Sequence, residues 1–198
     1  MVGLNKLQRV FTPPKSNTTF SEGHKSKGIL DDYAERQVVD SKEYSGNMMF
    51  VGGGLVYGEI YTEDNTGQQE LTTSMALITN FDTNGLSNQT TPDQANNKIT
   101  IKKKGVYKVC ASISVESVTG GGAFDIEIDV FWNGTTQPQL HAHRSMSGGG
   151  GDIGSIAITG FIDVTSVPTD IDLRALASAT KTVIFEDMNL NALMIGGT

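Results

Sequence analysis

Three carboxylates and two histidines near the middle of the chain have a spacing that could do chemistry. Asp125, Glu127 and Asp129 alternate with apolar residues, so their side chains leave one face of a strand about 7 Å apart. His141 and His143 follow, and an antiparallel register places His143 opposite Asp125 and His141 opposite Glu127. These groups bind metals or transfer protons. Ligands on a flat sheet rarely converge, however, so the spacing favours cross-strand charge pairs and predicts no metal site.

Other catalytic patterns do not occur in the sequence. It contains no Gly-x-Ser-x-Gly, Cys-His or metalloprotease spacing. The glycine run 148–151 lacks a following Lys-Ser or Lys-Thr and precedes a predicted strand, which argues against a phosphate loop. The run Lys102-Lys103-Lys104 is typical of a solvated turn. We therefore expect a protein that is not an enzyme, has no catalytic residues and needs no cofactor.

Composition limits the possible partners. The net charge is −7, so specific binding to nucleic acid is not expected. The charge is uneven: residues 1–50 hold seven Lys or Arg and six Asp or Glu, whereas residues 51–198 hold eight and sixteen. Cys110 is the single cysteine, so no intrachain disulfide forms. No signal peptide and no run of about 20 apolar residues is found, which predicts synthesis in a cytoplasm and no membrane partner.

The elements that position these residues are β-strands. Between Val106 and Glu116 apolar and polar residues alternate, as expected for a strand with one wet face. Glycines and other turn residues separate ten such segments. The predicted strands are 55–62, 74–81, 98–103, 105–117, 123–132, 138–146, 153–165, 170–177, 182–187 and 189–195. The sequence thus predicts an all-β, two-sheet sandwich or jelly roll over residues 55–198.

The predicted hairpin across Asn133-Gly134 can be tested by parity. Phe124, Ile126, Ile128, Val130 and Trp132 share one face, and Leu140, Ala142 and Met146 should share it too, which requires paired residue numbers with an even sum. A two-residue loop pairs 132 with 135 and gives an odd sum. We therefore expect a longer loop or a bulge near Pro138.

Residues 1–54 form a different kind of segment. Its apolar residues are too sparse to close a core, so alone it should be disordered. Fifty extended residues span at most about 165 Å, far enough to reach neighbouring subunits. We interpret the segment as an extended anchoring arm, although its basic stretch fits solubility equally well. The predicted anchoring residues are Leu4, Leu7, Val10, Phe11, Phe20, Lys25, Lys27, Ile29 and Leu30.

The strands resemble the C1q and tumour-necrosis-factor-like jelly rolls, in the form found in structural proteins of tailed bacteriophages. The resemblance covers roughly residues 55–196. Its best-matching piece is Ile99-Thr100-Ile101 followed by Gly105-Val106-Tyr107-Lys108-Val109. The other matches are Phe131-Trp132-Asn133-Gly134, His143-Arg144, the long strand Gly154 to Val164 and the last strand Leu190 to Ile195.

The resemblance implies ten strands in two sheets and a tight homotrimer about a threefold axis. It places the first strand, the last strand, the Tyr107 strand and the Ile156–Ile162 strand in the sheet that faces the axis. The outward parity of that sheet then becomes the trimer interface, where exposed apolar side chains are covered. The predicted interface residues are Tyr57, Tyr61, Val106, Lys108, Cys110, Ala157, Phe161, Leu193 and Ile195.

No collagen-like or coiled-coil stalk precedes the predicted domain, in contrast to many members of the family. We therefore expect a trimeric capsid decoration or cement protein located in the virion. Its partners would be other copies of itself and the major capsid protein or another virion protein, held through the arm. The alternative is a head-fibre or tail-fibre domain whose loops around 64–70, 84–97 and 147–152 recognise a host glycan or protein. A cellular C1q-like ligand is disfavoured by the missing signal peptide.

Overall fold

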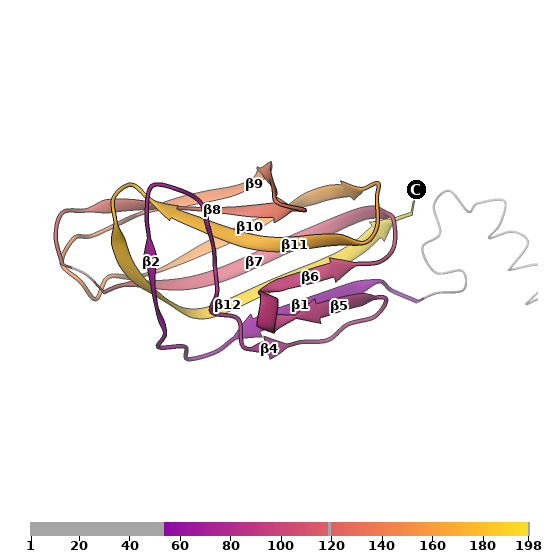
Figure 1. The fold of residues 1–198 in the computed structure, drawn as a ribbon, viewed down its shortest axis with the longest axis horizontal. Coiled ribbons are helices and arrows are strands. Elements are labelled where there is room, and N and C mark those ends of the chain that lie inside the picture. Colours follow the sequence, from indigo (N-terminus) through magenta and orange to yellow (C-terminus); the bar gives the residue numbers. More distant parts are fainter. Residues whose placement is uncertain (1–53, 119, 198) are drawn as a thin grey trace, which may run out of the picture. The chain divides into compact units, whose positions relative to one another are not determined.

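A computed structural model describes residues 54–118 and 120–197, which form two antiparallel sheets of six strands each (Figure 1). The first sheet contains β1 (Tyr57–Thr62), β2 (Gln68–Leu71), β4 (Thr83–Asn84), β7 (Gly105–Ser117), β10 (Ile153–Val164) and β12 (Lys181–Gly196). The second contains β3 (Ala76–Leu77), β5 (Thr90–Asp93), β6 (Lys98–Ile101), β8 (Phe124–Trp132), β9 (Thr135–Met146) and β11 (Thr169–Ala177).

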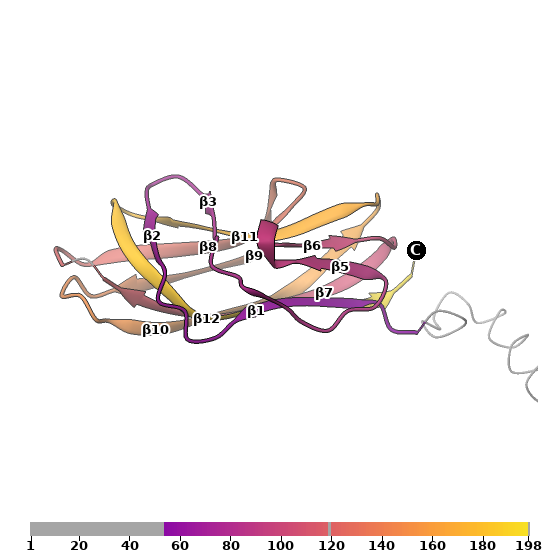
Figure 2. The same ribbon diagram turned by 60° about the horizontal axis from the view of Figure 1, so that its bottom comes forward.

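The strand order confirms the predicted all-β, two-sheet jelly roll. The first sheet runs β10-β7-β12-β1-β4, with β2 beside β12. The second runs β5-β6-β11-β8-β9, with β3 beside β11. The first strand, the last strand and the two long strands thus share one sheet, as the resemblance implies. Figure 2 shows the two layers one above the other.

Alternation along the strands builds the core between the layers. On β7, Tyr107, Val109, Ala111, Ile113 and Val115 point inward and are at most 3% exposed. They meet the inward side chains of the second sheet, such as Ile128 and Leu173, in one continuous apolar cluster. The polar residues between them face outward, because successive side chains of a strand alternate. The predicted core parity of β7 is therefore confirmed.

The described residues form twelve strands, not the predicted ten, and several strand boundaries differ from the prediction. The segments 182–187 and 189–195 form the single strand β12, whose register with β7 shifts at a bulge between Phe185 and Met188 and again between Met194 and Gly196. The segment 74–81 contributes only the two residues of β3. The strands β2 and β5 lack apolar alternation, so the sequence pattern did not reveal them. β5 holds Pro92 at the edge of its sheet, where a missing N–H group is tolerated.

The hairpin from β8 to β9 contains the predicted bulge. Asn133 and Gly134 form a two-residue turn with left-handed φ angles of 47° and 77°, and Trp132 pairs with Thr135. Val130 alone then lies across from residues 137–140 before regular pairing resumes. These extra residues shift the partners, so the expected histidine register is wrong by two residues. His143 lies opposite Glu127, and His141 lies opposite Asp129.

The arm prediction is not tested by the structure. Its anchoring residues Leu4, Leu7, Val10, Phe11, Phe20, Lys25, Lys27, Ile29 and Leu30 lie outside the described residues. In the part of the chain that is described, no helix has the length and apolar character needed to cross a membrane.

Candidate functional site

The outer face of the first sheet carries an apolar row across four strands. Phe161 on β10 lies opposite Lys108 on β7, Lys108 opposite Leu193 on β12, and Leu193 opposite Tyr57 on β1. Phe161 is 55% exposed, and Leu193 and Tyr57 are half-buried. Full burial of a large apolar side chain stabilises a protein by about 1.5–3 kcal/mol, and the Phe161 ring gains only part of this within one chain. Lys108 is the one charged side chain of the row.

The adjacent row, two residues further along each strand, is polar. Thr159, Cys110, Asn191 and Glu59 lie opposite one another in that order across β10, β7, β12 and β1. The Cys110 Sγ atom is 3.3 Å from the Thr159 hydroxyl. Asn191 Nδ2 donates to Asn189 Oδ1 at 2.7 Å, and Asn189 Nδ2 donates to Glu59 Oε1 at 2.6 Å. These hydrogen bonds hold the Glu59 carboxylate in one position on the sheet face.

All of the predicted interface residues lie on this one face of the first sheet. Lys108, Ala157, Phe161 and Ile195 are exposed, with Ile195 39% exposed. The half-buried members are Tyr57, Tyr61, Val106, Cys110 and Leu193. We call this surface, the outward side chains of β1, β7, β10 and β12, the assembly face.

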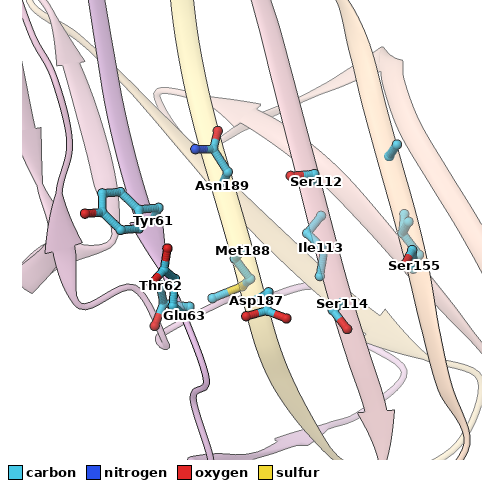
Figure 3. Close-up of a pocket in the computed structure, with 12 residues that line it drawn as sticks. Tyr61, Thr62, Glu63, Ser112, Ile113, Ser114, Ser155, Asp187, Met188 and Asn189 are labelled. Carbon is cyan, nitrogen blue, oxygen red and sulfur yellow. The ribbon is translucent and has the colours of Figure 1, made fainter.

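The other end of the assembly face is hollowed by a depression of about 600 Å³ with a mixed apolar and polar lining. Ile113, Ile156 and Met188 belong to its lining, together with polar side chains from four elements. Figure 3 shows Tyr61, Thr62 and Glu63 on one side, Met188 and Asn189 in the middle, and Ser112 and Ser155 on the other side. The lining residues are Tyr61, Thr62, Glu63, Ser112, Ile113, Ser114, Ser155, Ile156, Ala157, Asp187, Met188 and Asn189.

The β12 bulge shapes this depression. It inserts Glu186 and Asp187 between the inward residues Phe185 and Met188, so both carboxylates are carried on the outer face. Asn65 fixes the bulge, because its backbone N–H donates to Glu186 O at 2.9 Å and its Nδ2 donates to Phe185 O at 2.9 Å. The Ser114 hydroxyl donates to Glu186 Oε2 at 3.2 Å. The depression therefore offers acidic and hydroxyl groups.

The carboxylate and histidine cluster lies on the outer face of the second sheet. His141 Nδ1 is 2.5 Å from Asp129 Oδ1, and the Thr136 hydroxyl donates to Asp129 Oδ2 at 2.8 Å. A cross-strand contact between a histidine and a carboxylate is present, but it joins His141 to Asp129 and not to Glu127 as predicted, and Asp129 is only 9% exposed. The bulge of β9 explains this, because it brings Thr136 and His141 to the same carboxylate.

The second histidine of this cluster, His143, lies beside His141. The ring centroids of His141 and His143 are 6.0 Å apart. Over residues 54–118 and 120–197, no group of three His, Cys, Asp or Glu side chains is arranged to hold a metal ion.

The sequence pattern did not predict the two hydrogen bonds that connect Asn191 to Asn189 and Asn189 to Glu59. Asn189 and Asn191 stand at outward positions of the last predicted strand, which was a usable signal. Their partner Glu59 is 130 residues away from Asn189 in the chain, so only the strand register brings them together. The acidic bulge was missed because residues 186 and 187 were assigned to the end of a separate strand.

Comparisons with known proteins support the fold and nothing finer. No protein family model matches the chain, and no curated protein matches it. Solved structures do resemble it, among them the structure of Eiger TNF from S. frugiperda. That structure is 11% identical, has a TM-score of 0.52, and is matched over 73% of this chain and 94% of its own. At this identity the likeness shows a TNF-like jelly-roll fold alone.

Proposed function

We propose that this chain is a non-enzymatic virion structural protein, a homotrimer that decorates the capsid of a tailed bacteriophage. In this proposal the assembly faces of three copies meet, and the N-terminal arms fasten the trimer to the major capsid protein or another virion protein. Three arms acting together gain from effective concentration, so each can bind weakly. The role is mechanical: the trimer spans joints between capsid subunits and adds contact area across them.

The observation that carries the assembly part is the exposed apolar row. Phe161 and Ile195 are 55% and 39% exposed, and Leu193 lies in the same row as Phe161. Apolar side chains that gather on one sheet face, here on both sides of Lys108, are typical of an interaction surface, since their contact with water is unfavourable. The family that the sequence resembles forms trimers through this sheet. The TNF-like fold of the structure supports the choice of the same sheet here.

The attachment part is supported by the sequence. The segment 1–54 differs from the domain in charge and has isolated apolar residues suited to contacts along an extended chain. Residues 1–54 contain no collagen-like or heptad repeat.

Substitution of the apolar row tests the assembly. Phe161→Ser combined with Leu193→Ser should convert a trimer into single copies, as measured by light scattering on eluting protein, because most of the apolar contact area is lost. Leu86→Ser is the matched control: Leu86 is 74% exposed and lies outside the assembly face, so the trimer should persist. A wild-type chain that runs as a single copy would contradict the proposal.

Removal of residues 1–54 tests the attachment. The truncated protein should remain a trimer and lose binding to purified phage heads, measured by co-sedimentation with the particles. If the truncated trimer instead blocks adsorption of whole particles to host cells, the loops recognise a receptor and the fibre-domain alternative is correct.

A further inference from the structure

Among the charged side chains of the assembly face, Lys108 and Glu59 have opposite signs, and neither forms an ion pair within the described ranges. The ion pairs of residues 54–118 and 120–197 join Lys98 to Asp170, His141 to Asp129 and Arg174 to Asp172. Neither Lys108 nor Glu59 takes part in them. Lys108 is exposed between the apolar Phe161 and Leu193, and Glu59 is half-buried on β1.

The strand register separates these two charges in a single chain. β12 lies between β7 and β1, and Glu59 stands one row away from Tyr57, the residue in the Lys108 row. Two strand spacings and two residues along a strand correspond to a backbone separation of about 12 Å. The two groups therefore point outward from separate places on the same face.

The Glu59 carboxylate is held in position for a partner. Asn189 Nδ2 donates to Oε1 at 2.6 Å, and the hydrogen bond from Asn191 orients the Asn189 amide in turn. Oε2 lies directly over Gly85, where an added Cβ atom would be 2.4 Å away. The carboxylate thus sits between an amide donor and a bare glycine, neither of which neutralises its charge.

Covering the assembly face would bury both charges. Removing an ion from water costs several kcal/mol, and a buried charge without a partner is strongly destabilising. Phe161 and Leu193, which lie directly across from Lys108, cannot accept a hydrogen bond from its ammonium group, and the outward Asp163 lies one row away, opposite Val106, and forms no ion pair with it. Carboxylates outnumber ammonium groups on this face, since Asp163, Glu186 and Asp187 lie on it beside Glu59, so a second copy brings acceptors for Lys108.

We propose that the Lys108 ammonium of one copy binds the Glu59 carboxylate of the next copy. The inference rests on the proposed trimer. In a closed ring each contact joins one patch to a different patch of the neighbour, so a trimer forms the same pair at all three contacts. The pair would also fix how neighbouring copies align, because a shifted alignment would bring charges of the same sign together.

Charge reversal in the full-length protein tests this pair. Lys108→Glu and Glu59→Lys should each raise the concentration at which the trimer half-dissociates at least tenfold, measured by sedimentation over a dilution series. The double variant should return it to within about threefold of the wild type, because opposite charges face each other again. Lys102→Glu and Glu70→Lys reverse exposed charges of the same signs elsewhere, and both should leave the trimer unchanged.

The outcomes separate the two proposals. A wild-type trimer whose single reversals are additive in the double variant overturns the Lys108–Glu59 pair and leaves the trimer standing. A wild-type chain that never associates overturns the trimer itself. Circular dichroism shows whether each variant is folded. If a reversal unfolds the chain, Lys108→Met with Glu59→Gln replaces it, and that double variant should again associate better than either single one.

Discussion

Tyr107 shows how one residue joins the core to a turn. Its side chain is fully buried, and its hydroxyl donates to the Lys103 backbone carbonyl at 2.8 Å. Burial raises the pKa of Tyr107 to about 12, because the phenolate would be poorly solvated there. The hydrogen bond ties the start of β7 to the basic turn that precedes it.

The first prediction follows from this tie. Tyr107→Phe keeps the ring and removes the hydroxyl, so the free energy of unfolding at pH 7 should fall by about 1 kcal/mol. Above pH 10 the unfolded tyrosine loses its proton while the folded one keeps it, so the wild type loses stability as the pH rises toward 12. The variant lacks this loss. The difference between the two proteins should therefore shrink from pH 10 to 12 in urea titrations.

Lys103→Ala is the control for the tyrosine prediction. It removes a side-chain charge from the same turn but keeps the carbonyl that accepts the hydrogen bond. Its difference from wild type in the free energy of unfolding should not shrink between pH 10 and 12 as the Tyr107→Phe difference does. A constant difference between wild type and Tyr107→Phe over the whole range would contradict the prediction.

Among the elements, the β8–β9 hairpin depends on its two-residue turn. Asn133 and Gly134 both have left-handed φ angles, which match the twist of the flanking strands. Asn133 also joins the turn to β11, since its N–H donates to Asp170 O at 2.9 Å and its Oδ1 accepts from Asp170 N at 2.8 Å. The turn thus fixes both the hairpin and its place beside the neighbouring strand.

Gly134→Ala should lower the free energy of unfolding by about 1–2 kcal/mol, because a side chain disfavours the left-handed conformation. Space is not the cause: the nearest atom to an added Cβ is Arg174 Nη2 at 3.8 Å. Gly149→Ala is the matched control, since nothing lies within 4 Å of its added Cβ and its φ is not left-handed. Urea unfolding measures both, and equal effects would contradict the argument.

Element parity could be predicted from the sequence, but the exact register could not. The alternation around Val130 and Leu140 required a bulge, and the bulge is present. The pattern did not give its size, because polar residues near Pro138 fit several registers. β2 begins with Gln68-Gln69-Glu70, which has no apolar alternation and is held by pairing with β12. Tertiary pairing therefore decides what local pattern leaves open.

At the scale of the whole domain, the assembly face has two different ends. The apolar row lies where β1 begins and β12 ends, since Tyr57 pairs with Leu193. The depression lies toward the other end of the same strands, beside Tyr61 and Met188. In the proposed trimer the apolar end would supply most of the stabilising contact, because a dry apolar core surrounded by polar groups is typical of interfaces. The proposed Lys108–Glu59 pair belongs to this end.

Cys110 offers a direct probe of whether that end is covered. It is the single cysteine of the chain, and it lies on the assembly face in the row next to Phe161. A maleimide should therefore label the wild-type trimer at least tenfold more slowly than the Phe161→Ser, Leu193→Ser variant, with mass spectrometry following the reaction. A cysteine placed by Ser145→Cys in a Cys110→Ser chain should react at the same rate in both backgrounds, because residue 145 is exposed on the other sheet. Equal labelling of Cys110 in the wild type and in the double variant would mean that other copies do not cover this face.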